Sequence, residues 1–190
     1  MILPFSTVLD GINGAMEPRN FIVERRLSEM ADVFGNREAA HERLAADGDI
    51  IVYHAYEAAV PHEENQLVYR TTVIEPGDVA GEFFMTKGHH HERDSAEFYL
   101  GMSGRGLMVM QDRHGVSRTI GMYPGTAIYV PPAWAHRTVN TDSEPLVFLA
   151  VFFGDAGHDY ASIERTGFNL RVVRGGGGEP ETVTAATGGV

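Results

Sequence analysis

Histidine and carboxylate side chains are gathered in the middle of the sequence at a spacing that suits a metal ion. The motif GHHH at residues 88–91 sets His89 and His91 two residues apart, and such residues point to the same side of a β-strand. Glu97 opens the next candidate strand after a short turn, so a hairpin would bring its carboxylate back to both imidazoles. His136 opens a further candidate strand after a proline-rich turn. We therefore predict that these side chains together hold one divalent metal ion.

The types of these ligands limit the chemistry. Imidazoles with a carboxylate suit Fe(II), Mn(II), Ni(II) or Zn(II), and Fe(II) is our first expectation. The chain contains no cysteine, so thiolate ligands and disulfide bonds are excluded. A ligand set of this kind leaves exchangeable positions on the ion, which indicates catalysis or ligand binding. The alternative is that residues 89–91 form a solvated polar turn.

The elements that must position these residues are mostly strands. From about residue 50 onward, short runs rich in Val, Ile, Phe, Tyr and Thr alternate with turns that contain Gly, Pro or Asp. This texture predicts an antiparallel barrel or sandwich. The run LVFLAVFF at residues 146–153 is apolar without alternation, so we expect both of its faces to be covered.

The two ends of the chain differ from this β-rich part. Residues 24–46 carry helix-forming side chains, which Gly35 and Asn36 divide into two short helices, the second capped by Asn36. The Gly-rich segment 175–190 holds few large apolar side chains and is expected to be a flexible tail. Residues 1–174 are expected to form a single domain.

Composition and charge restrict the partners. The formal net charge is −11, which argues against nucleic acid, because phosphate backbones are bound by clusters of Lys and Arg. No run of apolar residues is long enough to cross a bilayer, so no membrane is expected. The N-terminus lacks the features of a signal peptide, and the cytoplasm is the expected location. Small molecules and proteins are the partners that remain.

The motifs around the predicted ligands are more specific than the ligands alone. They are PGDVAGEFFMTKGHHHERDSAEFYLGMSGRGLMVMQD at 76–112, PGTAIYVPPAWAHRTVN at 124–140, AGHDY at 156–160 and RRLSEM at 25–30. Together they resemble the cupin-type glucose-6-phosphate isomerases, the metal-dependent class known from archaea and some bacteria. The resemblance begins at RRLSEM and extends to about residue 173.

This resemblance implies a mainly β fold, the cupin double-stranded β-helix or jelly-roll barrel, with short N-terminal helices. It also implies a homodimer and an isomerase that interconverts glucose 6-phosphate and fructose 6-phosphate in glycolysis or gluconeogenesis. Glu97 is then the candidate base. His158 is the candidate assistant in proton movement or ring opening, because an imidazole titrates near neutrality.

The sugar phosphate is expected to bind with its phosphate away from the metal, through neutral donors. The resemblance assigns this task to Tyr53, Thr72, Thr86, Gly88 and Tyr160. Tyr99 lies two residues after Glu97, so it is expected on the same face, lining the sugar pocket. Alternation predicts that Lys87 faces outward. Phe152 stands where the family usually has a tyrosine.

Other functions remain open at this stage because the same metal site serves several chemistries. One alternative is an Fe(II) dioxygenase, and another is a different sugar-phosphate isomerase or epimerase. A non-catalytic sugar-binding cupin is an alternative from another class. For the isomerase itself, proton transfer through a cis-enediol and a metal-assisted hydride shift are both available.

Overall fold

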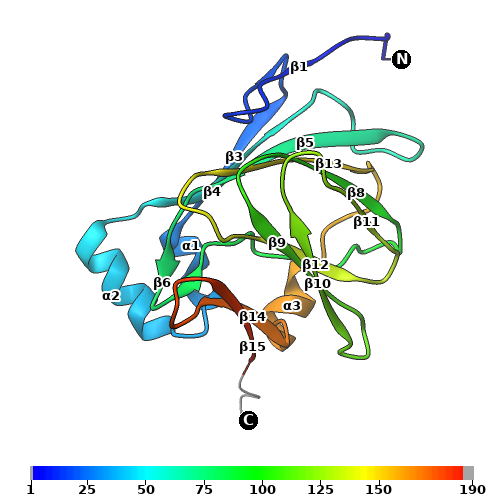
Figure 1. The fold of residues 1–190 in the computed structure, drawn as a ribbon. Helices are drawn as coiled ribbons and strands as arrows, with labels where there is room; N and C mark the ends of the chain where they lie inside the picture. Colours follow the sequence, from blue (N-terminus) through cyan, green and yellow to red (C-terminus); the bar gives the residue numbers. More distant parts are fainter. Residues whose placement is uncertain (1, 186–190) are drawn as a thin grey trace.

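Antiparallel strands are the main regular elements of the structure, a computed structural model that describes residues 2–185 (Figure 1). The N-terminal part contains β1 (Val8–Leu9), β2 (Met16–Glu17), β3 (Phe21–Arg26), α1 (Leu27–Met30), the 3₁₀ turn η1 (Ala31–Val33) and α2 (Arg37–Asp47). The body of the fold contains β4 (Ile51–Glu57), β5 (Leu67–Ile74), β6 (Asp78–Val79), β7 (Glu82–Phe83), β8 (Glu97–Ser103), β9 (Gly106–Gln111), β10 (Ser117–Met122), β11 (Ala127–Val130), β12 (Ala135–Asn140) and β13 (Leu146–Phe153). The C-terminal part contains α3 (Tyr160–Thr166), β14 (Leu170–Arg174) and β15 (Pro180–Thr184). The predicted mainly β fold is therefore confirmed.

The strands form sheets that curve around a common interior. The largest sheet has six strands in the order β11-β8-β13-β5-β4-β3, and a three-stranded sheet has the order β10-β9-β12. Side chains from both sheets meet in one apolar core, where Tyr99 and Phe148 join Met108 and Val139. The two sheets pack around this core and form a β-barrel, as expected of a cupin (Figure 1).

The central position of β13 explains its continuous apolar sequence. This strand pairs with β5 on one side and with β8 on the other, so no edge is exposed. Its residues Leu146, Val147 and Phe148 are consecutive and all buried, although neighbouring side chains point to opposite faces. The prediction that both faces of residues 146–153 are covered is confirmed for this part of the strand.

The first N-terminal helix is shorter than the sequence predicts. Residues 24–26 belong to β3, which pairs with β4 at the edge of the six-stranded sheet, so their assignment to a helix is wrong. Helix propensities are small, and pairing with a neighbouring strand outweighs them here. The second helix is as predicted, since the Asn36 side chain accepts a hydrogen bond of 3.0 Å from the backbone N–H of Ala39.

The C-terminal segment is a hairpin up to residue 185. Strand β15 pairs with β14 across a glycine-rich turn, so the flexible tail expected from residue 175 does not hold for 180–184. Backbone hydrogen bonds suffice to hold such an edge strand, and its side chains are exposed, which is why its composition contains little apolar signal. Residues 186–190, the rest of the expected tail, lie outside the described residues. Among residues 2–185, no helix has the length and apolar composition needed to cross a membrane.

Candidate metal centre and substrate cavity

The predicted metal ligands converge inside the barrel. One ligand atom from each of His89, His91, Glu97 and His136 lies within 4.8 Å of the others, and all four residues are buried. His89 and His136 are held side by side by backbone hydrogen bonds in both directions, of 3.3 and 3.1 Å. A carboxylate oxygen of Glu97, the first residue of β8, lies 3.0 Å from Nε2 of His91 and 2.9 Å from Nε2 of His136.

The imidazoles are oriented by hydrogen bonds on their other nitrogen. Nδ1–H of His91 donates to the Ser95 carbonyl at 2.9 Å, and Nδ1–H of His136 donates to the Trp134 carbonyl at 3.2 Å. Because a carbonyl can only accept, these contacts fix the tautomer that leaves the Nε2 lone pair free. Metal-binding histidines are commonly oriented in this way.

The donor set fits a divalent metal ion. Nε2 of His89 and Nε2 of His136 are buried and have no hydrogen-bond partner among residues 2–185, which is costly unless another group satisfies them. Burial, together with the neighbouring His136 and His158, holds the pKa of His89 well below its usual value, so this imidazole is neutral. Neutral imidazoles and an ionised carboxylate are the forms that bind metal.

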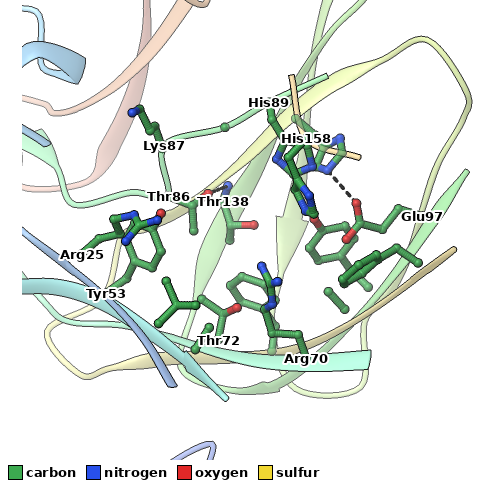
Figure 2. A pocket seen from close by; sticks show the side chains of 18 of the residues that line it. Arg25, Tyr53, Arg70, Thr72, Thr86, Lys87, His89, Glu97, Thr138 and His158 are labelled. Carbon is green, nitrogen blue, oxygen red and sulfur yellow. Dashed lines mark hydrogen bonds and ion pairs between the residues drawn. The ribbon is translucent and has the colours of Figure 1, made fainter. Parts of the chain in front are cut away.

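A cavity opens from this cluster and contains the residues expected to bind the substrate. His89, Glu97 and His136 line one end of it. Its wall also includes every residue to which the sequence analysis gives a substrate role, namely Tyr53, Thr72, Thr86, Gly88, Tyr99 and Tyr160. Figure 2 shows His89, His158 and Glu97 at one end of the cavity and Arg25, Tyr53 and Thr86 at the other. The structure therefore brings the predicted substrate residues together in one cavity with three of the four predicted metal ligands, all except His91.

His158 lies directly beside the metal ligands. Its ring is 4.4 Å from that of His89 between centroids, and it stacks on Tyr160 with an interplanar angle of 11°. The side chain of Asp159 accepts a hydrogen bond from the backbone N–H of Ser162, which starts α3 and fixes this loop. Burial, and secondarily the positive charge of Arg70, lowers the pKa of His158 to about 4. The imidazole is therefore neutral near pH 7.

Two arginines of the cavity wall are absent from the sequence prediction. Arg25 reaches the cavity from β3 and Arg70 from β5. The sequence could have indicated Arg70, because it lies two residues before Thr72 and therefore on the same face of β5. Lys87 also borders the cavity, but its Nζ lies 2.6 Å from a carboxylate oxygen of the exposed Glu164, and Figure 2 shows its side chain directed away from the other cavity residues.

Among solved structures, the chain is similar to oxalate decarboxylase from Bacillus subtilis. One such structure matches with a TM-score of 0.44 and 26% identity, and the match covers 56% of this chain and 26% of that chain.

Sequence comparison gives a closer relationship. The family model described as glucose-6-phosphate isomerase (GPI) matches residues 24–185. Glucose-6-phosphate isomerase from Thermococcus litoralis is 45% identical over 175 residues, which cover 92% of this chain and 91% of that protein. The protein of the same name from Thermococcus kodakarensis is 48% identical over 78% of each chain, and that from Sinorhizobium medicae is 33% identical over 92% of this chain and 83% of its own. This chain therefore belongs to the glucose-6-phosphate isomerase family.

Proposed function

We propose that this protein interconverts glucose 6-phosphate and fructose 6-phosphate with the help of one divalent metal ion. The observation that supports the proposal is a buried cluster of metal-ligand atoms within 4.8 Å of one another, at one end of a cavity whose other end carries hydroxyl and cationic groups. An open-chain sugar phosphate has matching ends, a carbonyl at one and a phosphate at the other.

His89, His91, Glu97 and His136 would hold the ion. When bound, a divalent metal supplies Lewis acidity that polarises the carbonyl and hydroxyl oxygens of the sugar, a contribution worth several kcal/mol. Fe(II) remains our first expectation, and Mn(II), Ni(II) and Zn(II) suit the same nitrogen and oxygen donors.

The proton must be moved by groups of the chain that stand near the reacting carbons. Burial alone would raise the pKa of Glu97, but His136 and His91 beside it hold that pKa well below its usual range, so the carboxylate is ionised and can accept a proton. The neutral imidazole of His158, next to His89, can pass a proton between sugar oxygens or assist ring opening. We propose these two residues as the catalytic pair.

The opposite end of the cavity suits the phosphate. Burial raises the pKa of Tyr53 to about 12, so its hydroxyl stays a donor. Gly88 has a φ of +79°, and a Cβ there would lie 2.6 Å from the ring of Phe168, so only glycine fits at this position. Arg25 and Lys87 add positive charge to the neutral donors that the sequence analysis expected. These groups explain how an acidic chain accepts an anionic sugar.

The test is the formation of glucose 6-phosphate from fructose 6-phosphate, followed by coupled oxidation. Protein stripped with a chelator is compared with protein reloaded with each of the four metals, and metal content is measured in every sample. We expect metal-dependent turnover that His136→Ala abolishes. His41→Ala, which changes an exposed histidine of α2, is the matched control and should stay fully active. Inactivity of every reloaded wild-type sample would contradict the proposal.

Further measurements distinguish the two isomerase mechanisms and the alternative functions. Deuterium from heavy water enters the sugar carbon if the proton leaves and returns through a base, whereas a hydride shift keeps the original hydrogen. Oxygen consumption would identify a dioxygenase, and tight sugar binding without turnover would identify a binding protein.

We also propose that the protein is a homodimer joined through the N-terminal edge of the large sheet. Strand β3 is the last strand of the six-stranded sheet, and its Phe21 and Ile22 are exposed apolar residues. The unpaired backbone groups of an open strand edge, together with apolar side chains, can bind the same edge of a second copy of the chain. Light scattering during gel filtration should give twice the mass of the chain. Ile22→Lys should shift that mass toward the monomer, and a monomeric wild-type protein would contradict the proposal.

A further inference from the structure

Arg70 is a charged side chain inside the cavity that the proposed mechanism has not used. It lies on β5, and its side chain points to the same face as Thr72, two residues farther along the strand. Figure 2 shows the Arg70 side chain directed from this strand into the cavity, between Thr72 and the metal-site residues. Only 19% of the side chain is exposed, so it is not an ordinary surface arginine.

A buried carboxylate on the neighbouring strand fixes the orientation of this guanidinium. Glu57 of β4 is the direct cross-strand partner of Arg70. Nε–H of Arg70 donates to a Glu57 carboxylate oxygen at 3.0 Å, and an Nη2–H group donates to the same oxygen. The other oxygen of Glu57 lies 2.7 Å from Nε2 of His62. Two contacts to one buried oxygen hold the guanidinium in a single direction.

One nitrogen of Arg70 is left over for a ligand. Within residues 2–185, Nη1 makes no hydrogen bond, whereas Nε and Nη2 are both used by Glu57. The guanidinium carbon lies 5.4 Å from the centre of the Phe152 ring, and that ring lies 5.6 Å from the ring of His158. The guanidinium therefore lies on the side of the cavity where Phe152 contacts His158.

Strand register places Arg70 between the two ends of the cavity. Across the large sheet, Arg70 is opposite Ala150, which is opposite Tyr99. The next row on the same face toward the metal contains Phe152 opposite Glu97, and the row on the other side contains Thr72. The small side chain of Ala150 leaves the space above this middle row open. A sugar phosphate that extends from the metal ligands to Thr72 must pass over Arg70.

We infer that Arg70 is a catalytic residue whose Nη1–H group donates to a sugar oxygen at the reacting end and stabilises the negative charge that forms there. The inference rests on the proposed isomerase function and on its proton-transfer route. In that route the C–H bond at C1 of fructose 6-phosphate breaks, the proton goes to the base, and the electron pair forms the C1–C2 double bond. The carbonyl oxygen at C2 takes the negative charge. The base then returns the proton to C2 while the hydroxyl proton moves from O1 to O2, which gives the aldose.

A preorganised donor aimed at developing charge lowers the barrier because it binds the transition state more strongly than the substrate. Removing one such donor typically costs about 10²-fold to 10³-fold in kcat. The charge of Arg70 is partly balanced by Glu57, so we expect the lower end of that range, about 10²-fold. KM should change by less than about threefold, since the contact strengthens only in the transition state.

The test replaces Arg70 in the metal-loaded protein and measures kcat and KM separately. Arg70→Met keeps the length of the side chain and removes the charge, while Arg70→Gln keeps a hydrogen-bonding group near Glu57 and serves if the first variant is unstable. Arg118→Met, at an exposed arginine of β10, is the matched control and should leave both constants unchanged. Metal content and the thermal midpoint are measured for each variant. In Arg70→Ala, added guanidinium at millimolar concentration should restore part of kcat, which a purely structural role does not predict.

The outcomes separate this inference from the function on which it rests. If wild-type protein turns over and both Arg70→Met and Arg70→Gln keep kcat within about threefold, Arg70 is not catalytic and the isomerase proposal stands. A raised KM with unchanged kcat would also overturn the inference, because Arg70 would then only bind the ground state. If wild-type protein shows no turnover with any metal, the proposed function fails and the role of Arg70 fails with it.

Discussion

Replacing Glu97 by glutamine should remove the stabilisation that metal binding gives to the fold. Glu97 is the one carboxylate among the predicted ligands, and its oxygen lies 2.9 Å from His136 and 3.0 Å from His91. A metal bound only by the folded state stabilises it by about 4.1 kcal/mol when the free metal is 1,000 times the Kd. A neutral amide is a much poorer ligand for a hard divalent ion than a carboxylate, and we expect the Kd to rise at least about 100-fold.

This weaker binding leaves about 1.4 kcal/mol of the original stabilisation at the same metal concentration. The difference, about 2.7 kcal/mol, corresponds to a decrease of about 5–11 °C in the thermal midpoint of a domain of this size. Without metal, the two proteins should melt at similar temperatures. The variant loses the contacts of a charged oxygen with His91 and His136, but it also avoids burying a carboxylate, and the two effects oppose each other.

Calorimetry of both proteins, with chelator and with added metal, measures this difference. Wild type should show a large metal-induced rise in the midpoint and Glu97→Gln a small one. Equal rises would refute the reasoning, because Glu97 would then not be a ligand. Activity gives a second readout, since loss of a general base usually costs about 10²-fold to 10⁴-fold in kcat even where the metal is retained.

Two further substitutions test the cavity and the barrel. Thr72→Val keeps the shape of a buried cavity residue but removes its hydroxyl. If Thr72 binds the phosphate, KM for fructose 6-phosphate should rise about tenfold. An unchanged KM in the coupled assay would exclude that role. Gly101→Ala should destabilise the protein by about 1–3 kcal/mol in denaturant unfolding, because a Cβ there would lie 2.3 Å from the carbonyl oxygen of Tyr123. Gly176→Ala is the control, since nothing lies within 4 Å of its Cβ, and an equal loss in both variants would contradict the steric explanation.

The metal ligands were predictable from the sequence because their positions depend on local rules. His89 and His91 lie two residues apart and Glu97 follows after a short connection, so all three come from one segment. The predicted hairpin is wrong, because β8 pairs with β11 and β13, whereas His89 bridges to His136. Only His136 comes from a distant segment, and its place at the start of a candidate strand after a proline-rich turn indicated it. The confirmed cap at Asn36 is likewise a local feature, because its partner is three residues away.

What the sequence could not show depends on which strands are neighbours. Arg25 lines the cavity only because β3 pairs with β4 at the edge of the large sheet. The same pairing turned residues 24–26 into a strand against their helix propensity. Alternation along β5 sets the face of Arg70, whereas the orientation of its guanidinium depends on Glu57 of the adjacent strand. Register across a sheet is not visible in a single sequence, so these contacts were missed.

Buried polar atoms without a hydrogen-bond partner destabilise the fold, and those near the predicted metal ligands mark a binding site. Four buried side-chain nitrogens have no partner among the described residues. Two of them, Nε2 of His89 and Nε2 of His136, belong to the predicted metal ligands, and the others are Nδ1 of His90 and Nε of Arg137. Other buried polar groups are paired, as Glu57 is with Arg70 and His62, and Asn140 is with two backbone carbonyls. Two unpaired imidazole nitrogens at one point, beside a buried carboxylate, are stable there only when a further group binds them. The local cost is thus itself evidence that this cluster is built to bind a metal ion.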